Sequence, residues 1–270
     1  MPPMEPMQPL LASGVAPYPL PEALERLHGD GFGFAGPLLY SNFVSSLDGV
    51  VALGDGRHAG SVISGRNPAD RFLMGLLRAC ADAVLIGAGT LRATPDHLWT
   101  PEHIAPDLAA EWAELRRRLG RAKSPLLAVL SASGEIDVTH PAIQAGATVL
   151  TTRAGADRLD ATGLPPACRV VVTGEDRRVE AGAAVAALRA DGHRHLLTEG
   201  GPGVMGQLLD AGLLEEMFLT LSPAVAGRSG AEERPGFTAG VELMPGRTGW
   251  WRLLSVHRHR DHLFLRYARA

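Results

Sequence analysis

The chain has 270 residues, of which 46% are hydrophobic and 20% are charged, and its formal net charge at pH 7 is -3. This composition is ordinary for a globular protein that buries a core, and the charge gives no reason to expect nucleic acid or an anionic membrane as partner. The two cysteines, Cys80 and Cys168, lie in apolar stretches, which favours buried free thiols over a disulfide. The expected partners are therefore small molecules or a second copy of the chain.

The first 36 residues are rich in proline and glycine and contain one short helical candidate, at 21–27. Residues 1–20 have no lysine or arginine and no sustained apolar core, so they do not resemble a secretory signal. No stretch reaches the roughly 20 apolar residues that span a bilayer. We therefore expect a loosely packed N-terminal extension over 1–36 and one domain over 37–270, in a cytoplasmic protein.

From residue 37 onward, short apolar runs alternate with amphipathic stretches, which is typical of parallel strands connected by helices. The expected strands are 38–45, 83–87, 126–130, 148–151, 169–172, 195–197 and 216–222. The expected helices are 68–81, 106–119, 179–190 and 203–211. The first of these helices has three start signals, with Asn67 as N-cap, Pro68 at the first position and Asp70 in the first turn.

The end of the chain differs from this alternation. Two further strands, 251–258 and 262–267, are joined by a tight polar link and predict an antiparallel hairpin at the edge of the sheet. In the helix 106–119, the run Arg116, Arg117 and Arg118 is expected on a solvated face.

Two glycine-rich turns follow expected strands. Gly200-Gly201-Pro202-Gly203 lies between a strand and a helix, where free backbone N–H groups and a helix N-terminus let a pyrophosphate approach closely. A tight turn that merely uses glycine explains the same residues equally well. Gly87-Ala88-Gly89-Thr90 follows another strand, so two parallel strands would open both turns on one edge of the sheet, where α/β sheets bind nucleotides.

Neither turn fits the G-x-G-x-x-G or the Walker A pattern, which argues against a Rossmann domain or a P-loop enzyme. Polar residues also stand at strand ends: Glu199 precedes the glycines, and Ser45, Ser46 and Asp48 end the first strand. A capping or exposed carboxylate at Glu199 and a simple turn at Asp48 remain the alternatives.

Three further motifs bear on the chemistry. The run 257–262 holds three histidines, but it lies at a hairpin tip with interspersed arginines that would repel a cation, so we expect no metal site. The zinc signature of a deaminase and the G-x-S-x-G motif of a serine hydrolase are both absent from the sequence.

Five blocks in order resemble the reductase domain of the riboflavin pathway, the family of 5-amino-6-(5-phosphoribosylamino)uracil reductases, which is related in fold to dihydrofolate reductase. The blocks are Asn-Phe-Val-Ser-Ser-Leu-Asp-Gly at 42–49, Ile-Ser-Gly at 63–65, the stretch 76–90, the stretch 198–209, and Leu-Thr-Leu-Ser-Pro at 219–223. The resemblance extends from about residue 37 to the C-terminus.

The resemblance implies a three-layer α/β/α fold like that of dihydrofolate reductase, with a mostly parallel sheet and an antiparallel C-terminal hairpin, in a homodimer. It implies an NADPH-dependent oxidoreductase of riboflavin biosynthesis that transfers hydride to the ribosyl C1 of this substrate or a close analogue. The implied NADPH-binding residues are Ser45, Gly87, Gly89, Thr90, Ser131, Gly200, Gly201, Pro202, Gly203, Val204, Met205, Gly206 and Gln207.

On the substrate side, the resemblance assigns Arg78 to the phosphate, because a guanidinium forks to two oxygens, and Glu199 to the sugar or the ring. It gives catalytic roles to Asp48 and Glu199. Arg153, which follows the strand 148–151, is our candidate for binding the 2′-phosphate of NADPH.

The sequence also departs from the family. Val50 replaces the usual lysine or arginine, and Thr94-Pro95-Asp96 replaces the usual Asp-Asp-Pro. Both changes fall on the substrate side. Two alternatives therefore stay open: an NADPH reductase of the same fold with another small substrate, including a dihydrofolate-like one, and a non-catalytic module that binds the cofactor.

Overall fold

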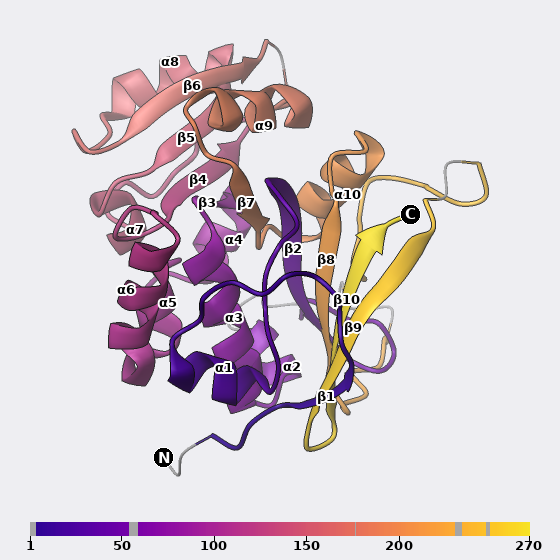
Figure 1. Cartoon of the computed structure of the whole chain (residues 1–270). Coiled ribbons are helices and arrows are strands. Elements are labelled where there is room, and N and C mark those ends of the chain that lie inside the picture. The colour runs from indigo at the N-terminus through magenta and orange to yellow at the C-terminus, as the bar shows by residue number, and fades with distance from the viewer. Residues whose placement is uncertain (1–3, 54–58, 176, 230–233, 247–248) are drawn as a thin grey trace.

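A ten-stranded sheet runs through the centre of the molecule, with helices on both faces (Figure 1). The computed structural model describes residues 4–53, 59–175, 177–229, 234–246 and 249–270. In sheet order the strands are β1 (Gln8–Leu11), β9 (Trp251–His259), β10 (His262–Arg269), β8 (Glu216–Leu221), β2 (Leu38–Ser45), β7 (His195–Thr198), β3 (Ala83–Gly87), β4 (Leu126–Ser131), β5 (Thr148–Thr152) and β6 (Arg169–Gly174).

The strands from β8 to β6 pair in parallel, whereas β10 pairs antiparallel with β8 and β9, and β1 pairs antiparallel with β9. This arrangement confirms the predicted mostly parallel sheet with an antiparallel C-terminal hairpin. Leu197 of β7 lies opposite Tyr40 of β2 on one side and Val84 of β3 on the other. The carboxyl ends of these three central strands therefore meet at one edge of the sheet.

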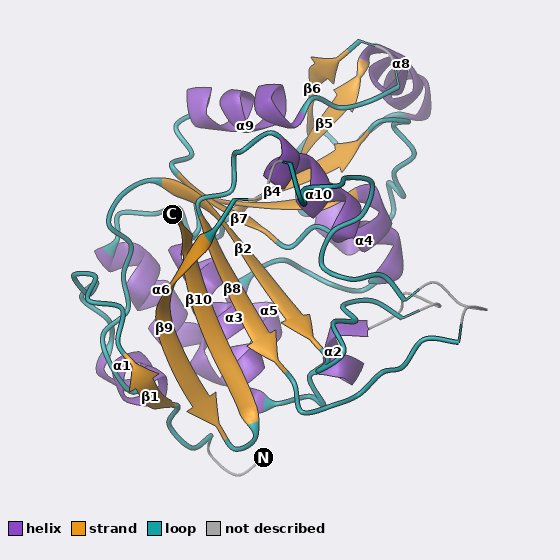
Figure 2. Ribbon diagram, turned by 90° about the vertical axis from the view of Figure 1, so that its right-hand side faces the viewer, coloured by secondary structure: helices purple, strands orange, loops and turns teal. Residues whose placement is uncertain are grey.

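The helices connect the strands and cover both faces of the sheet. They are α1 (Glu22–His28), α2 (Ala59–Ile63), α3 (Pro68–Cys80), α4 (Ala88–Ala93), α5 (Pro101–Ile104), α6 (Ala109–Arg118), α7 (Pro141–Gln144), α8 (Arg153–Thr162), α9 (Ala181–Ala190) and α10 (Pro202–Asp210), with a 3-10 turn at Pro106–Leu108. One apolar core packs α1, α3 and α6 against one face, and a second packs α9 and α10 against the other (Figure 2). The predicted three-layer fold is confirmed.

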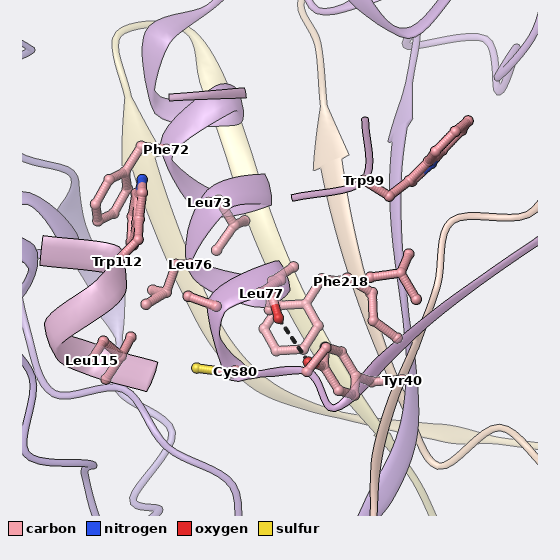
Figure 3. Close-up of a cluster of buried hydrophobic side chains, with 14 of the residues drawn as sticks. Tyr40, Phe72, Leu73, Leu76, Leu77, Cys80, Trp99, Trp112, Leu115 and Phe218 are labelled. Atoms are coloured by element: carbon pink, nitrogen blue, oxygen red, sulfur yellow. Dashed lines mark hydrogen bonds between the residues drawn. The ribbon is translucent and has the colours of Figure 1, made fainter. Parts of the chain in front are cut away.

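Helix α3 begins at the residues that the sequence predicted, and its side chains and backbone then contact β2 and α6. The Asn67 side chain accepts a hydrogen bond from the Ala69 N–H at 2.8 Å, as an N-cap does. The Tyr40 hydroxyl of β2 donates to the Leu77 carbonyl at 2.8 Å, and Phe72 packs against Trp112 of α6 (Figure 3). The helix is thereby held to both the sheet and α6.

The expectation that Arg116 lies with its two neighbours on a solvated face is wrong. Its side chain is 1% exposed, and Nη1 donates to the carbonyls of Arg78, Ala79 and Ala81 at 3.2, 3.1 and 2.8 Å. The last carbonyls of a helix have no partner within that helix. Arg116 supplies these partners, so α6 closes the C-terminal end of α3.

The prediction that residues 1–36 pack loosely is wrong. Met7, Leu24, Phe32 and Phe34 are at most 6% exposed and belong to the core under α3. β1 adds a strand to the sheet beyond the hairpin. Apolar residues spaced between prolines and glycines gave no clear period, which is why the sequence did not reveal this packing. The boundary at residue 37 stays a prediction.

Several short elements were also missed. The segment Gly87-Ala88-Gly89-Thr90 was predicted as a loop, but it opens α4, with Gly87 as N-cap. β1, α2, α5, α7 and α8 were not expected, and all but α8 have only four or five residues. Among the described residues, no helix has both the length and the apolar character needed to cross a membrane.

Candidate active site

The two predicted glycine turns lie side by side at the carboxyl edge of the sheet. β3 runs into α4 through Gly87, and its neighbour β7 runs into α10 through the residues 199–201. A Cβ placed on Gly87 would lie 3.0 Å from Val204 of α10, and one placed on Gly201 would lie 3.7 Å from the Thr90 hydroxyl of α4. The sequence therefore predicted correctly that both turns open on the same edge.

Both turns line one cleft, with a volume of about 570 Å³, which lies in the range of small-molecule and cofactor sites. A Cβ added to Gly89 or Gly203 would have no atom of the described residues within 4 Å beyond the chain neighbours and the backbone of its own helix, so the Cα atoms of these glycines face open space. Gly201 is the N-cap of α10 and has no side chain to bond the first-turn N–H groups. Pro202 has no N–H and the Val204 N–H donates to the Gly201 carbonyl at 3.0 Å, so in the first turn it is the Gly203 N–H that can meet an anionic ligand group.

A buried ion pair forms the floor of the cleft. Arg78 of α3 donates from Nε to Oε1 of Glu199 at 3.0 Å and from Nη2 to Oε2 at 2.6 Å, and its side chain is 1% exposed. Such two-point contacts fix the orientation of both groups. The carboxylate that ends β7 is therefore held in place by the helix on one face of the sheet.

The remaining donors of Arg78 are also used. Nη1 donates to the carbonyls of Leu98 and Thr100 at 3.2 and 3.3 Å, and Nη2 lies 2.9 Å from Nε2 of His97. All five N–H donors of a guanidinium thus have partners. Burial, followed by the charge of Arg78, lowers the pKa of His97 to about 2, so its ring is neutral and Nε2 can accept this bond.

A family model described as the RibD C-terminal domain matches residues 37–244. The chain belongs to this family. A curated relative, the 2,5-diamino-6-ribosylamino-4(3H)-pyrimidinone 5′-phosphate reductase of Archaeoglobus fulgidus, is 27% identical over 192 residues, which are 71% of this chain and 82% of that protein.

Solved structures give the same fold for this RibD C-terminal domain. A pyrimidine reductase-like protein from Corynebacterium diphtheriae has a TM-score of 0.63 at 23% identity, covering 93% of this chain and 96% of that one. The riboflavin biosynthesis reductase of Saccharomyces cerevisiae has a TM-score of 0.57 at 18% identity, covering 93% and 96%. RibD of Acinetobacter baumannii has a TM-score of 0.63 at 18% identity, and the match covers 91% of this chain but only 60% of RibD.

Of the residues that the family resemblance assigns, most of the two turns and the ion pair line the cleft. They are Arg78, Gly87, Gly89, Thr90, Glu199, Gly200, Gly201, Pro202, Gly203 and Val204. Met205 is fully buried in the core under α10, and a Cβ on Gly206 would collide with the Ala239 carbonyl at 2.3 Å. These last two residues pack the helix rather than face the cleft, and their cofactor role stays a prediction.

Ser45, Ser131 and Asp48 lie outside the cleft lining. The Ser45 hydroxyl donates to the Ser46 carbonyl at 2.8 Å, and Ser131 ends β4 with its side chain buried. Asp48 accepts bonds from the Ser46 hydroxyl and from the N–H groups of residues 226 and 227, and these bonds hold its pKa well below the ordinary value. Asp48 thus joins two loops here, and the predicted roles of all three residues stay untested.

Two other predicted features lie away from the cleft. Arg153 is exposed at the start of α8, so its contact with a 2′-phosphate stays a prediction. His257 is buried beside His28 and Asp30, and Nε2 of His257 and Nδ1 of His28 each lie 2.8 Å from the same Asp30 oxygen. Among the described residues, these three form a group that could hold a metal ion. Hydrogen bonds from the two histidines to Asp30 already explain why the three side chains lie together.

Four charged or titratable residues of the cleft were not predicted from the sequence, namely Arg66, Asp70, Arg71 and His97. Asp70 was predicted only as a helix start signal. A spacing of eight residues places Asp70 two turns before Arg78 on the same face of α3, and this signal could have brought it to the site. The departures from the family lie close by: Thr94 lines the cleft, and Val50 is fully buried.

Proposed function

We propose that this protein is an NADPH-dependent reductase of riboflavin biosynthesis, which transfers hydride to C1 of the ribosyl group of 5-amino-6-(5-phosphoribosylamino)uracil or a close analogue. The observation that carries the proposal is the pair of glycine turns that open side by side on one cleft, above the Glu199–Arg78 ion pair. Family membership and the named activity of the Archaeoglobus relative support the substrate class.

The cleft fits a dinucleotide on its own geometry. Side chains at Gly89, Gly201 or Gly203 would occupy space that the cleft now leaves open, and the Gly203 N–H at the amino end of α10 is placed to bond a phosphate oxygen. Bound here, a reduced nicotinamide supplies the hydride, while the protein aligns donor and acceptor. We propose that Gly87, Gly89, Thr90 and the residues 200–204 hold it.

Glu199 is the proposed substrate-binding carboxylate. Each of its oxygens accepts one bond from Arg78, and a carboxylate oxygen can accept a second bond from a sugar hydroxyl or a ring N–H. Arg78 then acts as a positioning residue for Glu199. To bind the substrate phosphate as well, Arg78 would have to exchange one of its present partners. Arg66 and Arg71, which also line the cleft, are therefore the better-placed phosphate ligands.

A second candidate function is a reductase of the same fold whose small substrate has no phosphate. The full set of partners around Arg78, and the buried Val50 in place of a cation, favour this alternative.

The decisive experiment mixes the purified protein with NADPH and each candidate substrate and follows the nicotinamide absorbance. Oxidation with the ribosylaminopyrimidine phosphate supports the first proposal. Oxidation only with an unphosphorylated substrate, such as dihydrofolate, would replace it with the second. NADPH binding without oxidation of NADPH in the presence of any of these compounds would contradict both. The homodimer and the cytoplasmic location belong to the same proposal, and sedimentation of the protein tests the first of them.

A further inference from the structure

Asp70 is a buried carboxyl in the wall of the cleft. It lies in the first turn of α3, and the spacing of Asp70, Met74 and Arg78 places all three on one face of the helix. All three line the cleft, and Asp70 is only 6% exposed. The carboxyl therefore meets the same space as Glu199 while being almost closed to bulk water.

The groups around Asp70 come from four parts of the chain. Glu199 faces it from the end of β7, Arg71 neighbours it on α3, and the hydroxyls of Ser64 and Thr220 approach from the α2–α3 connection and β8. The Thr220 hydroxyl is buried and has no hydrogen bond of good geometry within the described part of the chain. His262 of β10 bonds the Ser64 carbonyl at 3.0 Å.

Asp70 makes no salt bridge within the described part of the chain. Burial raises the pKa of Asp70 to about 6, and the charge of Glu199 adds to this effect. Thr220, Ser64 and Arg71 act in the opposite direction but do not cancel it. A carboxyl in this state holds a proton far more often near neutral pH than an exposed aspartate does.

The other titratable groups that line the cleft are poor proton donors. Arg66, Arg71 and Arg78 carry guanidinium groups, a chemical type that binds anions and does not serve as a general acid. His97 uses Nε2 as an acceptor for Arg78, and Glu199 is engaged by Arg78 through both oxygens. Asp70 alone among these described groups combines a place in the cleft wall with a proton to give.

We propose that Asp70 is the proton donor of the reduction. The inference rests on the proposed function. In the step it serves, the bond between the ribosyl C1 and the ring oxygen breaks, and the ring oxygen takes the proton of Asp70. The amino nitrogen lone pair forms a C1–N double bond at the same time. Hydride from the reduced nicotinamide then adds to C1, the double-bond electrons return to nitrogen, and Asp70 regains a proton from water.

The test compares the parent protein with Asp70→Asn, Asp70→Glu and the control Asp107→Asn, which changes an exposed aspartate of the 3-10 turn. Asp70→Asn should lower kcat by roughly 100-fold or more and leave the Kd for NADPH unchanged, since general acids contribute factors of this size. Asp70→Glu should restore part of kcat, and Asp107→Asn should match the parent. The kcat of the parent should fall as pH rises above about 6, a fall that Asp70→Asn should not show.

A second measurement needs no turnover. In protein free of nucleotide, the ¹³C signal of the Asp70 carboxyl, assigned by its loss in Asp70→Asn, should titrate near pH 6. Titration near pH 4, or an unchanged kcat in Asp70→Asn while the parent turns over, overturns the inference. If the parent protein fails to oxidise NADPH with every candidate substrate, the proposed function itself is overturned, and the proton-donor role with it.

Discussion

Glu199 is fixed by two hydrogen bonds from one guanidinium, at 3.0 and 2.6 Å. We expect Glu199→Gln to reduce turnover strongly while changing the Kd for NADPH little, because an amide of the same shape loses the charge that the substrate meets. Steady-state kinetics and a fluorescence titration with NADPH measure the two quantities. The exposed Glu180→Gln at the start of α9 is the control. An equal loss in kcat and NADPH affinity would count against a substrate role for Glu199.

The buried carboxyl of Asp70 should also lower the free energy of unfolding at neutral pH. Its pKa is about 6 in the folded protein and 3.8 ordinarily, so between these values the folded state binds more protons than the unfolded state. The free energy of unfolding therefore falls as pH rises from about 4 to 6 and stays low above that. Asp70→Asn should be more stable than the parent at pH 7.5 by about 1–3 kcal/mol. Urea titrations should show that this difference disappears near pH 3. If the parent and Asp70→Asn were equally stable at both pH values, the raised pKa of Asp70 would be contradicted.

At the scale of elements, the two strand-to-helix turns make the cleft. Gly201 has an ordinary φ of −66°, and its Cβ position is free of backbone contacts, so a side chain there should be tolerated by the fold and enter the cleft. We expect Gly201→Val to weaken NADPH binding by roughly 100-fold or more while leaving the Tm within a few degrees of the parent. Calorimetric titration and thermal melts check both.

Gly182→Val is the matched control for this change, because Gly182 lies exposed on α9 with no atom near its Cβ position. It should keep full NADPH affinity. Full affinity in Gly201→Val would move the cofactor away from the α10 turn.

The contact between α6 and α3 depends on Arg116. Its removal leaves the buried carbonyls of Arg78, Ala79 and Ala81 without their donor. We expect Arg116→Leu to lower the free energy of unfolding by about 2–4 kcal/mol, measured in urea. The neighbouring Arg117, whose side chain is 73% exposed, is the control, and Arg117→Leu should be nearly neutral. A neutral Arg116→Leu would mean that water replaces the guanidinium.

Elements with strong local signals could be predicted, and contacts between elements could not. Asn67 and Pro68 predicted the start of α3, and the alternation of apolar runs with amphipathic stretches predicted the parallel sheet. The Arg116 contact was hidden because its acceptors belong to a different helix. Asp70 was visible as a start signal, but the pKa of its carboxyl depends on Thr220 of β8 and on Glu199 after β7, which lie far along the chain. The glycine turns were found because their chemistry is local.

At the scale of the whole molecule, α1 covers part of the core under α3. Leu24 is fully buried there, whereas Glu22, two residues before it, is exposed. Leu24→Ala should lower the free energy of unfolding by about 2–4 kcal/mol, because it leaves a cavity under the helix. Urea titration measures this, with Glu22→Ala as the control that should match the parent. A nearly neutral Leu24→Ala would indicate that α1 detaches without disturbing the sheet.

The segment before residue 37 also completes the surroundings of a buried cation. Arg266 of β10 pairs with Glu216, stacks within 5.5 Å of the rings of Phe32 and Phe34, and donates to the Gly33 carbonyl at 2.9 Å. The family match begins at residue 37, downstream of Phe32, Gly33 and Phe34. A gene fragment that begins at that boundary would lose both of these rings and this carbonyl, and the buried guanidinium would be left without them. Expression of this reductase should therefore retain its first three dozen codons.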